Sequence, residues 1–371
     1  MCNPSLITSV PPNLGKPLFS FGLLTDTHFN AGPKTVPSRY QTVNERNEHV
    51  LRVLGDQRPD FIIHLGDIVT PLPHFPEHEA TLLRAQRALA LADCPVHVLP
   101  GNHDIGDKPA KWLRAPTVTS KAIRTFEHHW GPSYSSFDWG PCRLILLNTP
   151  LFNSGLAEEH QQWEWLFEQL KTNKRCFLFT HYPPFIHDPD EPSHYENLDD
   201  PARTRLLRVL ERYQVEALFS GHTHNPFRDQ YQNTALYVLP STAFFRPEYE
   251  EFYAREPLEG DADKLGGFMV RVYDTGHVAH LLPTRGNTGP APRRMGPPPT
   301  PENRWAPVDS ISERNGMRRS PYPMPVTSMN FAVRPSETIT DCLPFGTWGS
   351  NTFGFRLMIW WIRRRAHGWH Y

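Results

Sequence analysis

Short apolar runs alternate with segments of helical spacing over most of the chain. Runs of four to eight mostly apolar residues are typical of buried strands. Six of them precede residue 221: Leu18–Thr25, Phe61–Leu65, Val96–Leu99, Leu144–Leu147, Cys176–Thr180 and Ala217–Ser220. Helical periodicity with acidic or proline-marked starts indicates helices at Glu45–Leu54, Glu77–Ala92, Glu158–Leu170 and Ala202–Tyr213. The alternation predicts an α/β fold with helices outside the sheet.

Three more strand-like runs follow without helices between them: Leu236–Leu239, Phe268–Tyr273 and His277–Leu282. Strands that follow one another without an intervening helix are typical of antiparallel pairing. We therefore expect a more antiparallel second half, and two sheets with helical outer layers.

Charge and proline content change near residue 284. The 371 residues carry a formal net charge of -1, but the segment from Arg285 to Tyr371 holds 12 Arg, no Lys and 5 acidic residues. It sums to about +7, which leaves about -8 for residues 1–284. The segment also holds 12 of the 39 prolines. We predict a leader at residues 1–18, a catalytic domain at 19–284, an extended or disordered Pro/Arg-rich linker at 285–330 and an aromatic, arginine-rich tail at 331–371.

The tail allows two interpretations. Apolar residues alternate over Phe353–Trp361, which indicates a strand that docks on the catalytic domain. Tryptophans next to Arg363–Arg365 also suit peripheral contact with a membrane.

Composition excludes several classes of protein. A near-neutral chain is not typical of a nucleic-acid binder, and no run of about 18 apolar residues predicts a spanning helix. The N-terminal residues do not resemble a signal peptide. Five scattered cysteines without CxxC spacing argue against a disulfide framework or a cysteine zinc site, so we expect a reducing, cytoplasmic location. Oligomeric state is not predicted.

Polar side chains of a restricted kind follow five of the predicted strands. They are Asp26 and His28 after the first strand, Asp67 after the second, Asn102, His103 and Asp104 after the third, then His181, and finally His222 and His224. Ligands in open α/β sheets bind beyond the carboxyl ends of the strands. Oxygen and imidazole donors without thiolate suit Mn, Fe or Zn ions.

Local spacing adds geometry to this pattern. In Asp26-x-His28 and His222-x-His224, side chains two residues apart point the same way if the segment is extended. Glycines before Asp67, Asn102 and His222 allow sharp turns. Seven ligands, two of them carboxylates, are more than one tetrahedral ion can bind. They suit two ions about 3.5–4 Å apart that share a carboxylate.

The motifs DxH, GD, GNHD, H and GHxH, in this order, resemble the calcineurin-like metallophosphoesterase family, including class III cyclic-nucleotide phosphodiesterases. The resemblance runs from about Phe19 to Leu282 and implies a four-layered α/β/β/α sandwich. It implies one metal held by Asp26, His28, Asp67 and His224 and another held by Asp67, Asn102, His181 and His222. It further implies that His103 is the acid that meets the substrate and that Asp104 supports it.

These observations predict phosphoester hydrolysis by a hydroxide that bridges two metal ions. We expect a small phosphodiester or phosphomonoester as substrate, because an acidic catalytic segment repels nucleic acid. A protein phosphatase and a catalytically silent interaction scaffold are the alternatives. The loop Tyr182–Asp200 is interpreted either as a lid over the site or as a solvated acidic loop, and Arg246 is a candidate contact to substrate phosphate.

Overall fold

The computed structural model describes residues 14–32, 42–111, 113–246 and 265–283. The linker and tail expected at 285–330 and 331–371 lie outside the described residues, as does most of the expected leader. No helix in the described part of the chain is long and apolar enough to cross a membrane.

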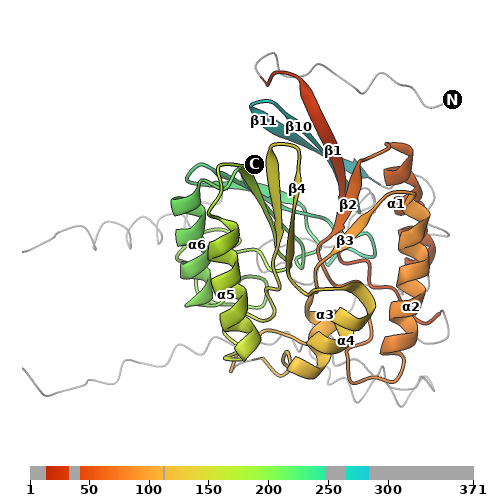
Figure 1. Ribbon diagram of the computed structural model, residues 1–371. Helices are drawn as coiled ribbons and strands as arrows, with labels where there is room; N and C mark the ends of the chain where they lie inside the picture. The colour runs from red at the N-terminus through yellow and green to blue at the C-terminus, as the bar shows by residue number, and fades with distance from the viewer. Residues whose placement is uncertain (1–13, 33–41, 112, 247–264, 284–371) are drawn as a thin grey trace, which may run out of the picture. The chain divides into compact units, whose positions relative to one another are not determined.

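Two sheets form the centre of the described domain (Figure 1). The first sheet has the order β11-β10-β1-β2-β3, and its strands are β1 (Pro17–Leu24), β2 (Phe61–His64), β3 (Val96–Val98), β10 (Gly266–Tyr273) and β11 (Gly276–Pro283). β1, β2 and β3 are parallel to one another, and β10 and β11 are antiparallel additions to this core.

The second sheet has the order β4-β5-β6-β7-β9-β8. Its strands are β4 (Ser135–Trp139), β5 (Cys142–Leu146), β6 (Arg175–Phe179), β7 (Ala217–Ser220), β8 (Phe227–Tyr231) and β9 (Thr234–Val238). β5, β6, β7 and β9 are parallel. The expectation of a more antiparallel second half holds for β10 and β11. β9 is antiparallel to β8 on one side and parallel to β7 on the other, because the hairpin with β8 returns the chain in the direction of β7.

Side-chain alternation along the strands explains the layering. In β6, Phe177 and Phe179 enter the core between the sheets, whereas Cys176 and Leu178 face the helices. In β2, Phe61 and Ile63 lie between the sheets and Ile62 faces the other way. Since both faces of each sheet are apolar, both must be covered.

Helices provide that cover. α1 (Val43–Asp56), α2 (His78–Leu89), the short 3₁₀ turn η3 (Ala90–Ala92) and α4 (Ser120–Trp130) pack on the first sheet. α5 (Ala157–Gln169) and α6 (Ala202–Tyr213) pack on the second. Figure 1 shows the two helical groups on opposite sides of the strands. The predicted four-layered α/β/β/α sandwich is confirmed.

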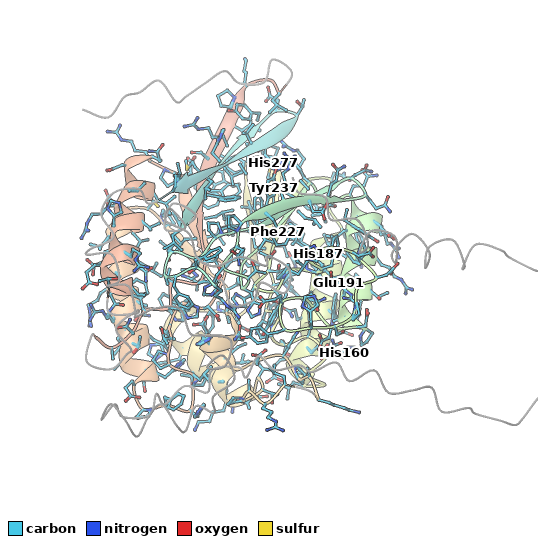
Figure 2. The ribbon with its side chains drawn as sticks, turned by 180° about the vertical axis from the view of Figure 1, so that it is seen from behind. His160, His187, Glu191, Phe227, Tyr237 and His277 are labelled. Atoms are coloured by element: carbon cyan, nitrogen blue, oxygen red, sulfur yellow. The ribbon has the colours of Figure 1, made fainter. Side chains whose placement is uncertain are left out.

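A polar contact also joins the two sheets. His277 of β11 bonds to the Glu216 carboxylate at 2.7 Å and to the Tyr237 hydroxyl of β9 at 3.2 Å. Figure 2 shows His277 and Tyr237 close together at this end of the domain. Arg175 binds both oxygens of Glu216, at 2.6 and 2.8 Å, and so completes this half-buried network.

Four elements were not predicted from the sequence: α3 (Asn102–Ile105), α4, β4 and β8. β4 and β8 are edge strands whose residues are half-buried or exposed, so they lack an apolar run. α4 presents only Ala122, Ile123 and Phe126 to the core. The Thr119 side chain caps its first turn by accepting the Ala122 N–H at 3.2 Å.

Candidate metal centre

The loops that follow β1, β2, β3, β6 and β7 meet at one edge of the two sheets. Backbone hydrogen bonds hold them together. The Asp26 N–H donates to the Gly66 carbonyl at 3.0 Å, and the His28 N–H donates to the Asp67 carbonyl at 3.0 Å. The Gly221 N–H donates to the His181 carbonyl at 2.9 Å. The His222 N–H also donates to Asp26 Oδ2 at 2.9 Å, which fixes residues 196 positions apart beside one another.

The first group of donor atoms consists of Asp26, His28, Asp67 and His224. His28 Nε2 lies 3.2 Å from His224 Nε2 and 3.6 Å from Asp67 Oδ2. His224 Nε2 lies 3.3 Å from Asp26 Oδ1. Ligands about 2.0–2.2 Å from one ion lie about 3 Å apart in an octahedron or tetrahedron. The four atoms thus converge on a volume of the size of one ion.

The second group consists of Asp67, Asn102, His181 and His222. His181 Nε2 lies 3.4 Å from Asp67 Oδ1, 3.0 Å from Asn102 Oδ1 and 3.2 Å from His222 Nδ1. Asp67 therefore offers Oδ2 to the first group and Oδ1 to the second. The structure brings together all seven residues that the sequence predicted as ligands, in the two sets that the resemblance implied.

Backbone carbonyls orient the histidine ligands. His181 Nδ1 bonds to the Leu65 carbonyl at 2.8 Å, and His224 Nδ1 bonds to the Phe244 carbonyl at 2.9 Å. His222 Nε2 bonds to the Tyr195 carbonyl at 3.1 Å. A carbonyl accepts only a proton, so the opposite nitrogen of each ring is left with a lone pair that faces the donor group.

A buried carboxylate oxygen without a hydrogen-bond partner supports a cation at this place. Asp26 is fully buried, and its Oδ2 accepts hydrogen bonds from the Thr25 hydroxyl at 2.7 Å and the His222 N–H at 2.9 Å. Its Oδ1, which faces His224, has no hydrogen-bond partner. A buried carboxylate oxygen without a partner is costly unless a cation binds it. The residues present therefore fit a metal.

Charge states at four of the ligands agree with this fit. Burial alone would raise the pKa of Asp26 and of Asp67, but neighbouring histidines, mainly His224 and His181 respectively, outweigh it and lower both pKa values. Burial lowers the pKa of His28 and of His222 well below the ordinary value. Ionised carboxylates and neutral imidazoles are the forms that bind metals. His181 differs: burial would lower its pKa, but the Asp67 carboxylate outweighs burial and raises the pKa to about 9, so this ring must lose a proton when an ion binds.

The backbone at the ligands differs from the extended segments that the sequence suggested. Five ligands have positive φ angles: Asp26 at 51°, His28 at 44°, Asp67 at 52°, His222 at 69° and His224 at 60°. The left-handed region costs residues other than glycine about 1–3 kcal/mol each and is common at functional sites. The side chains of each pair, Asp26 with His28 and His222 with His224, do reach one place, as expected. Left-handed turns, and not the alternation of an extended segment, bring them there.

Two glycines allow the close approach of the loops. Gly66 has a φ of +90°, and a Cβ there would lie 2.3 Å from the Gly101 nitrogen. A Cβ at Gly101 would lie 2.2 Å from Asp67 Oδ1. Both positions therefore require glycine, as the motifs indicated.

His103 lies beside the first donor group but is only half-buried, whereas the seven ligands are buried. Its ring stands edge-on to His28, with centroids 4.7 Å apart. Its Nδ1 bonds to the Thr70 carbonyl at 2.7 Å, which leaves Nε2 available. His28, Asp67 and His103 also form a geometrically acceptable metal group, so His103 is placed either to meet a substrate or to bind an ion.

Asp104 does not support His103 directly. Its carboxylate accepts the Gly101 N–H at 2.8 Å and the Ile68 N–H at 3.0 Å. It thus joins the loop that carries Asp67 to the loop that carries His103. The expected contact to the imidazole is replaced by the Thr70 carbonyl, because the carboxylate is already used by backbone N–H groups. Burial, followed by the nearby Asp67 charge, raises the pKa of Asp104 to about 7.

The loop Tyr182–Asp200 packs onto the site, and its Tyr195 hydroxyl lies 3.4 Å from Asn102 Nδ2. The side chain of Lys108 holds the loop from below: its ammonium donates to the His194 carbonyl at 2.6 Å and to Asp199 Oδ1 at 3.0 Å. His187 and Glu191 of this loop, labelled in Figure 2, are exposed and half-buried, respectively. The lid interpretation fits these contacts better than a solvated loop.

Sequence analysis missed several residues around the site or gave them a different role. Arg246 donates to the His222 carbonyl at 2.9 Å and to Glu196 Oε1 at 3.3 Å, so its observed contacts are within the protein. Phe244 lies 4.5 Å from His224, ring to ring. Lys108 and Tyr195 carry no motif that marks them, because their role arises from contacts between distant loops.

Comparisons with known proteins were consistent with the geometry. The family model described as calcineurin-like phosphoesterase matches residues 19–226. The serine/threonine-protein phosphatase CPPED1 of Danio rerio is 33% identical over 177 residues, which are 45% of this chain and 54% of that protein. The probable glycerophosphodiester phosphodiesterase GpdQ of Arcobacter nitrofigilis is 28% identical over 214 residues, 54% of this chain and 70% of that protein.

Among solved structures, a dimetal phosphatase from Danio rerio aligns with a TM-score of 0.47 at 15% identity and covers 72% of this chain and 99% of that one. The chain spans about half the length of the CPPED1 proteins that it matches. The family model, in contrast, matches more than half of the chain, and the matched residues include all seven ligands. This protein therefore belongs to the calcineurin-like phosphoesterase family.

Proposed function

We propose that this protein hydrolyses phosphomonoesters with two metal ions, one in each donor group. The observation that carries the proposal is Asp67, whose two carboxylate oxygens face different histidine sets, 3.6 Å from His28 and 3.4 Å from His181. One carboxylate that serves two ions is the arrangement used to clamp a phosphoryl group.

Asp26, His28, Asp67 and His224 would hold one ion, and Asp67, Asn102, His181 and His222 the other. When bound, the ions supply charge neutralisation for the phosphoryl oxygens and a water acidic enough to act at neutral pH. The donor set of nitrogen and oxygen suits Mn, Fe or Zn.

His103 is the residue assigned to proton transfer. The Thr70 carbonyl accepts the Nδ1 proton, so Nε2 is the atom that faces the substrate. The ring acts as an acid in its doubly protonated form: Nε2–H gives its proton to the leaving alkoxide, and the neutral ring that remains keeps its proton on Nδ1. Its half-buried position leaves the ring accessible from solvent, as a group that meets the substrate requires. Asp104 and the Thr70 carbonyl position the ring and its loop.

A phosphorylated protein side chain is the substrate class favoured by the relatives, since six vertebrate proteins named serine/threonine-protein phosphatase CPPED1 match at 28–33% identity. The sequence alone favoured a small phosphoester and placed a protein phosphatase second. A small phosphodiester is the second candidate here, supported by the relatives named glycerophosphodiester phosphodiesterase and cyclic-nucleotide phosphodiesterase.

The test is a substrate panel assayed after the metals are removed and Mn, Fe or Zn is added separately. The panel consists of a phosphoserine peptide, p-nitrophenyl phosphate and bis(p-nitrophenyl) phosphate. We expect metal-dependent turnover of the peptide and the monoester to exceed that of the diester. Faster turnover of the diester would favour the phosphodiesterase, and no turnover with any metal would favour the silent scaffold.

A further inference from the structure

A cationic stripe lies on the outer face of α6, away from the donor groups. Arg205, Arg208 and Arg212 are separated by three and four positions, which places them on one face of a helix. All three are exposed. The helix carries four arginines and one glutamate, although residues 1–284 together carry about -8.

The three arginines differ from the fourth in their partners. Arg203 is buried and pairs with the Asp200 carboxylate at 2.6 Å. In the described part of the chain, no carboxylate lies within ion-pair distance of the other three. Their charges are therefore available to a partner, and their spacing along one helix face distinguishes them from single exposed arginines elsewhere, such as Arg58 and Arg87.

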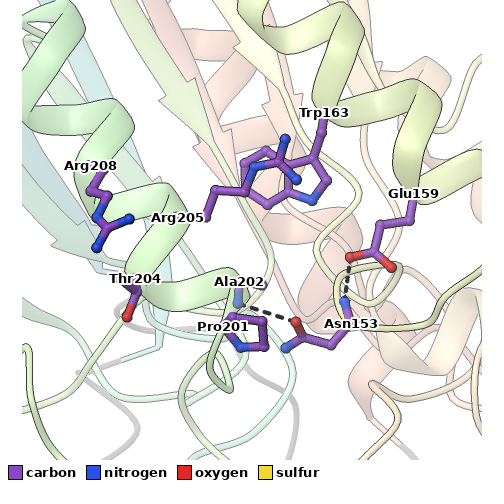
Figure 3. Close-up of a pocket in the computed structure, with 8 residues that line it drawn as sticks. All are labelled: Asn153, Glu159, Trp163, Pro201, Ala202, Thr204, Arg205 and Arg208. Carbon is purple, nitrogen blue, oxygen red and sulfur yellow. Dashed lines mark hydrogen bonds between the residues drawn. The ribbon is translucent and has the colours of Figure 1, made fainter.

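A cavity of about 370 Å³ opens at the start of this stripe, between α5 and α6 (Figure 3). Asn153, Glu159 and Trp163 line one wall, and Thr204, Arg205 and Arg208 line the other. The Arg205 guanidinium lies 4.3 Å from the Trp163 ring centroid, which fixes the cation at the cavity.

Glu159 also lines the cavity, and its charge acts on Arg205, but it makes no direct ion pair with the described arginines of the stripe. Its carboxylate accepts the Asn153 N–H at 2.7 Å and the Gly155 N–H at 2.9 Å, so it is committed to the loop before α5. Figure 3 shows the Glu159–Asn153 bond on the side of the cavity opposite Arg208.

We propose that this cavity and stripe bind an acidic segment of a protein substrate, with a carboxylate or phosphate side chain in the cavity and further acidic side chains along Arg208 and Arg212. Charge complementarity supports this occupant. From Arg205 to Arg212 the helix rises about 10 Å, which an extended peptide spans in three or four residues. Arginine binds carboxylate and phosphate groups through paired N–H donors.

A nucleic acid fits this surface less well. The stripe offers three cations on a domain of about -8, which disfavours a long polyanion. The Trp163 ring is 2% exposed and lies under Arg205, so it is not available for base stacking.

The surface is linked to the metal centre by the loop that ends at α6. The Asn153 amide donates to the Asp199 carbonyl at 2.8 Å, and the Ala202 N–H donates to Asn153 Oδ1 at 3.1 Å. Tyr195, which contacts the donor groups, precedes Pro201 by six residues, at most about 20 Å of chain. One substrate can therefore reach both places with a spacer of about six to ten residues.

Binding is tested first without turnover. A fluorescein-labelled peptide with six glutamates is titrated by anisotropy into the full-length, metal-loaded protein, and into the R205Q/R208Q variant. The R58Q/R87Q variant, which removes two exposed arginines elsewhere, is the control. We expect the first variant to bind at least ten-fold more weakly, the control to bind as the parent does, and a six-glutamine peptide not to bind.

Because Arg205 packs on Trp163, R208Q/R212Q provides a second variant that leaves this contact intact. The proposal is overturned if both variants bind like the parent, if the control weakens equally, or if a single-stranded oligonucleotide binds more tightly than the acidic peptide. Competition by millimolar inorganic phosphate alone, with no effect of the glutamates, would also overturn it.

The kinetic arm rests on the proposed function. Phosphoserine peptides with the acidic segment placed two or eight residues away are compared. We expect the longer spacer to lower KM at least five-fold, R205Q/R208Q to abolish the gain, and p-nitrophenyl phosphate turnover to stay unchanged. An absence of all turnover would contradict the proposed function but not the docking surface, which the anisotropy measurement judges separately.

Discussion

At the scale of single residues, the metal centre depends on side chains in which one polar atom is held by a hydrogen bond and another polar atom faces the donor group. Asp26 Oδ2 accepts the His222 N–H, whereas Asp26 Oδ1 has no hydrogen-bond partner. His181 Nδ1 bonds to the Leu65 carbonyl, and its Nε2 faces the donor group. His103 follows the same rule through the Thr70 carbonyl. Each ligand therefore reaches the centre already oriented, which reduces the conformational entropy lost when an ion binds.

Replacement of His103 by alanine separates proton transfer from metal binding. Because none of the seven ligands is held by its ring, His103→Ala should retain both ions. It should lower kcat by about 10²–10⁴, the usual contribution of a general acid or base. Elemental analysis and steady-state kinetics check this. Loss of an ion together with the rate would show that His103 is a ligand instead.

Gly101 tests the close packing of the loops. Its φ is -100°, so alanine brings no backbone penalty there, but the added Cβ would meet Asp67 Oδ1 at 2.2 Å. We expect Gly101→Ala to weaken metal binding at least ten-fold. Gly131→Ala is the control, because its φ of +86° is strained while nothing lies within 4 Å of the new Cβ. The account fails here if the control weakens metal binding as much as Gly101→Ala does.

At the scale of elements, the strand ends were predictable and the turns beyond them were not. The apolar runs marked β1, β2, β3, β6 and β7, and the polar residues after them marked the ligands. Left-handed turns at the ligands and the packing of Tyr182–Asp200 arise from contacts between segments far apart in the chain. The edge strands β4 and β8 were missed for the related reason that an exposed edge leaves no apolar run.

Within the loop Tyr182–Asp200, Glu191 provides a pH-dependent anchor. Partial burial tends to raise its pKa, but hydrogen bonds from His194, Asn197 and the N–H groups of His187 and Ile186 outweigh this and lower it to about 2. A lowered carboxyl pKa contributes stability that is present above the ordinary value of 4.5 and is lost as pH falls toward 2.

The prediction is that Glu191→Gln unfolds more easily than the parent at pH 6, and that this difference shrinks as pH falls from 5 to 3. Urea unfolding of both proteins without metal, at each pH, measures the difference. A difference that stays constant or grows toward low pH would contradict the assigned anchor. Glu48→Gln, at a half-buried position of α1, is the control, because Glu48 pairs with Arg52 at 3.3 Å in a simple i,i+4 contact.

At the scale of the whole molecule, two sheets enclose an aromatic core, and the carboxyl ends of their parallel strands lie at one edge. Phe21 of the first sheet lies 5.9 Å from Phe179 of the second, and the Glu216–His277 pair ties the sheets at the other end. The layering followed from alternation in the sequence. The roles of the linker and tail concern residues outside the described ranges, and cytoplasmic location and membrane contact stay predictions.

Metal binding should also stabilise the whole domain, because the buried carboxylates Asp26 and Asp67 lie close to each other and repel. At an ion concentration 100 times Kd, one site adds about 2.7 kcal/mol. For a domain of this size, loss of one ion should lower Tm by about 5–10 °C, and chelation of both ions by about twice as much. Scanning calorimetry with and without EDTA checks this, and an unchanged Tm would contradict a loaded site of that affinity.

The central claim is that Asp67 serves two ions at once. Asp67→Asn keeps the shape of the side chain, but removes its charge and the second anionic oxygen that faces His181 or His28. The measurement is the metal content per chain of the parent and the variant, purified identically and equilibrated with Mn. We predict two ions in the parent, one or none in Asp67→Asn, and a loss of phosphomonoester turnover of at least 10²-fold. Two ions retained in the variant, with turnover close to that of the parent, would contradict the account.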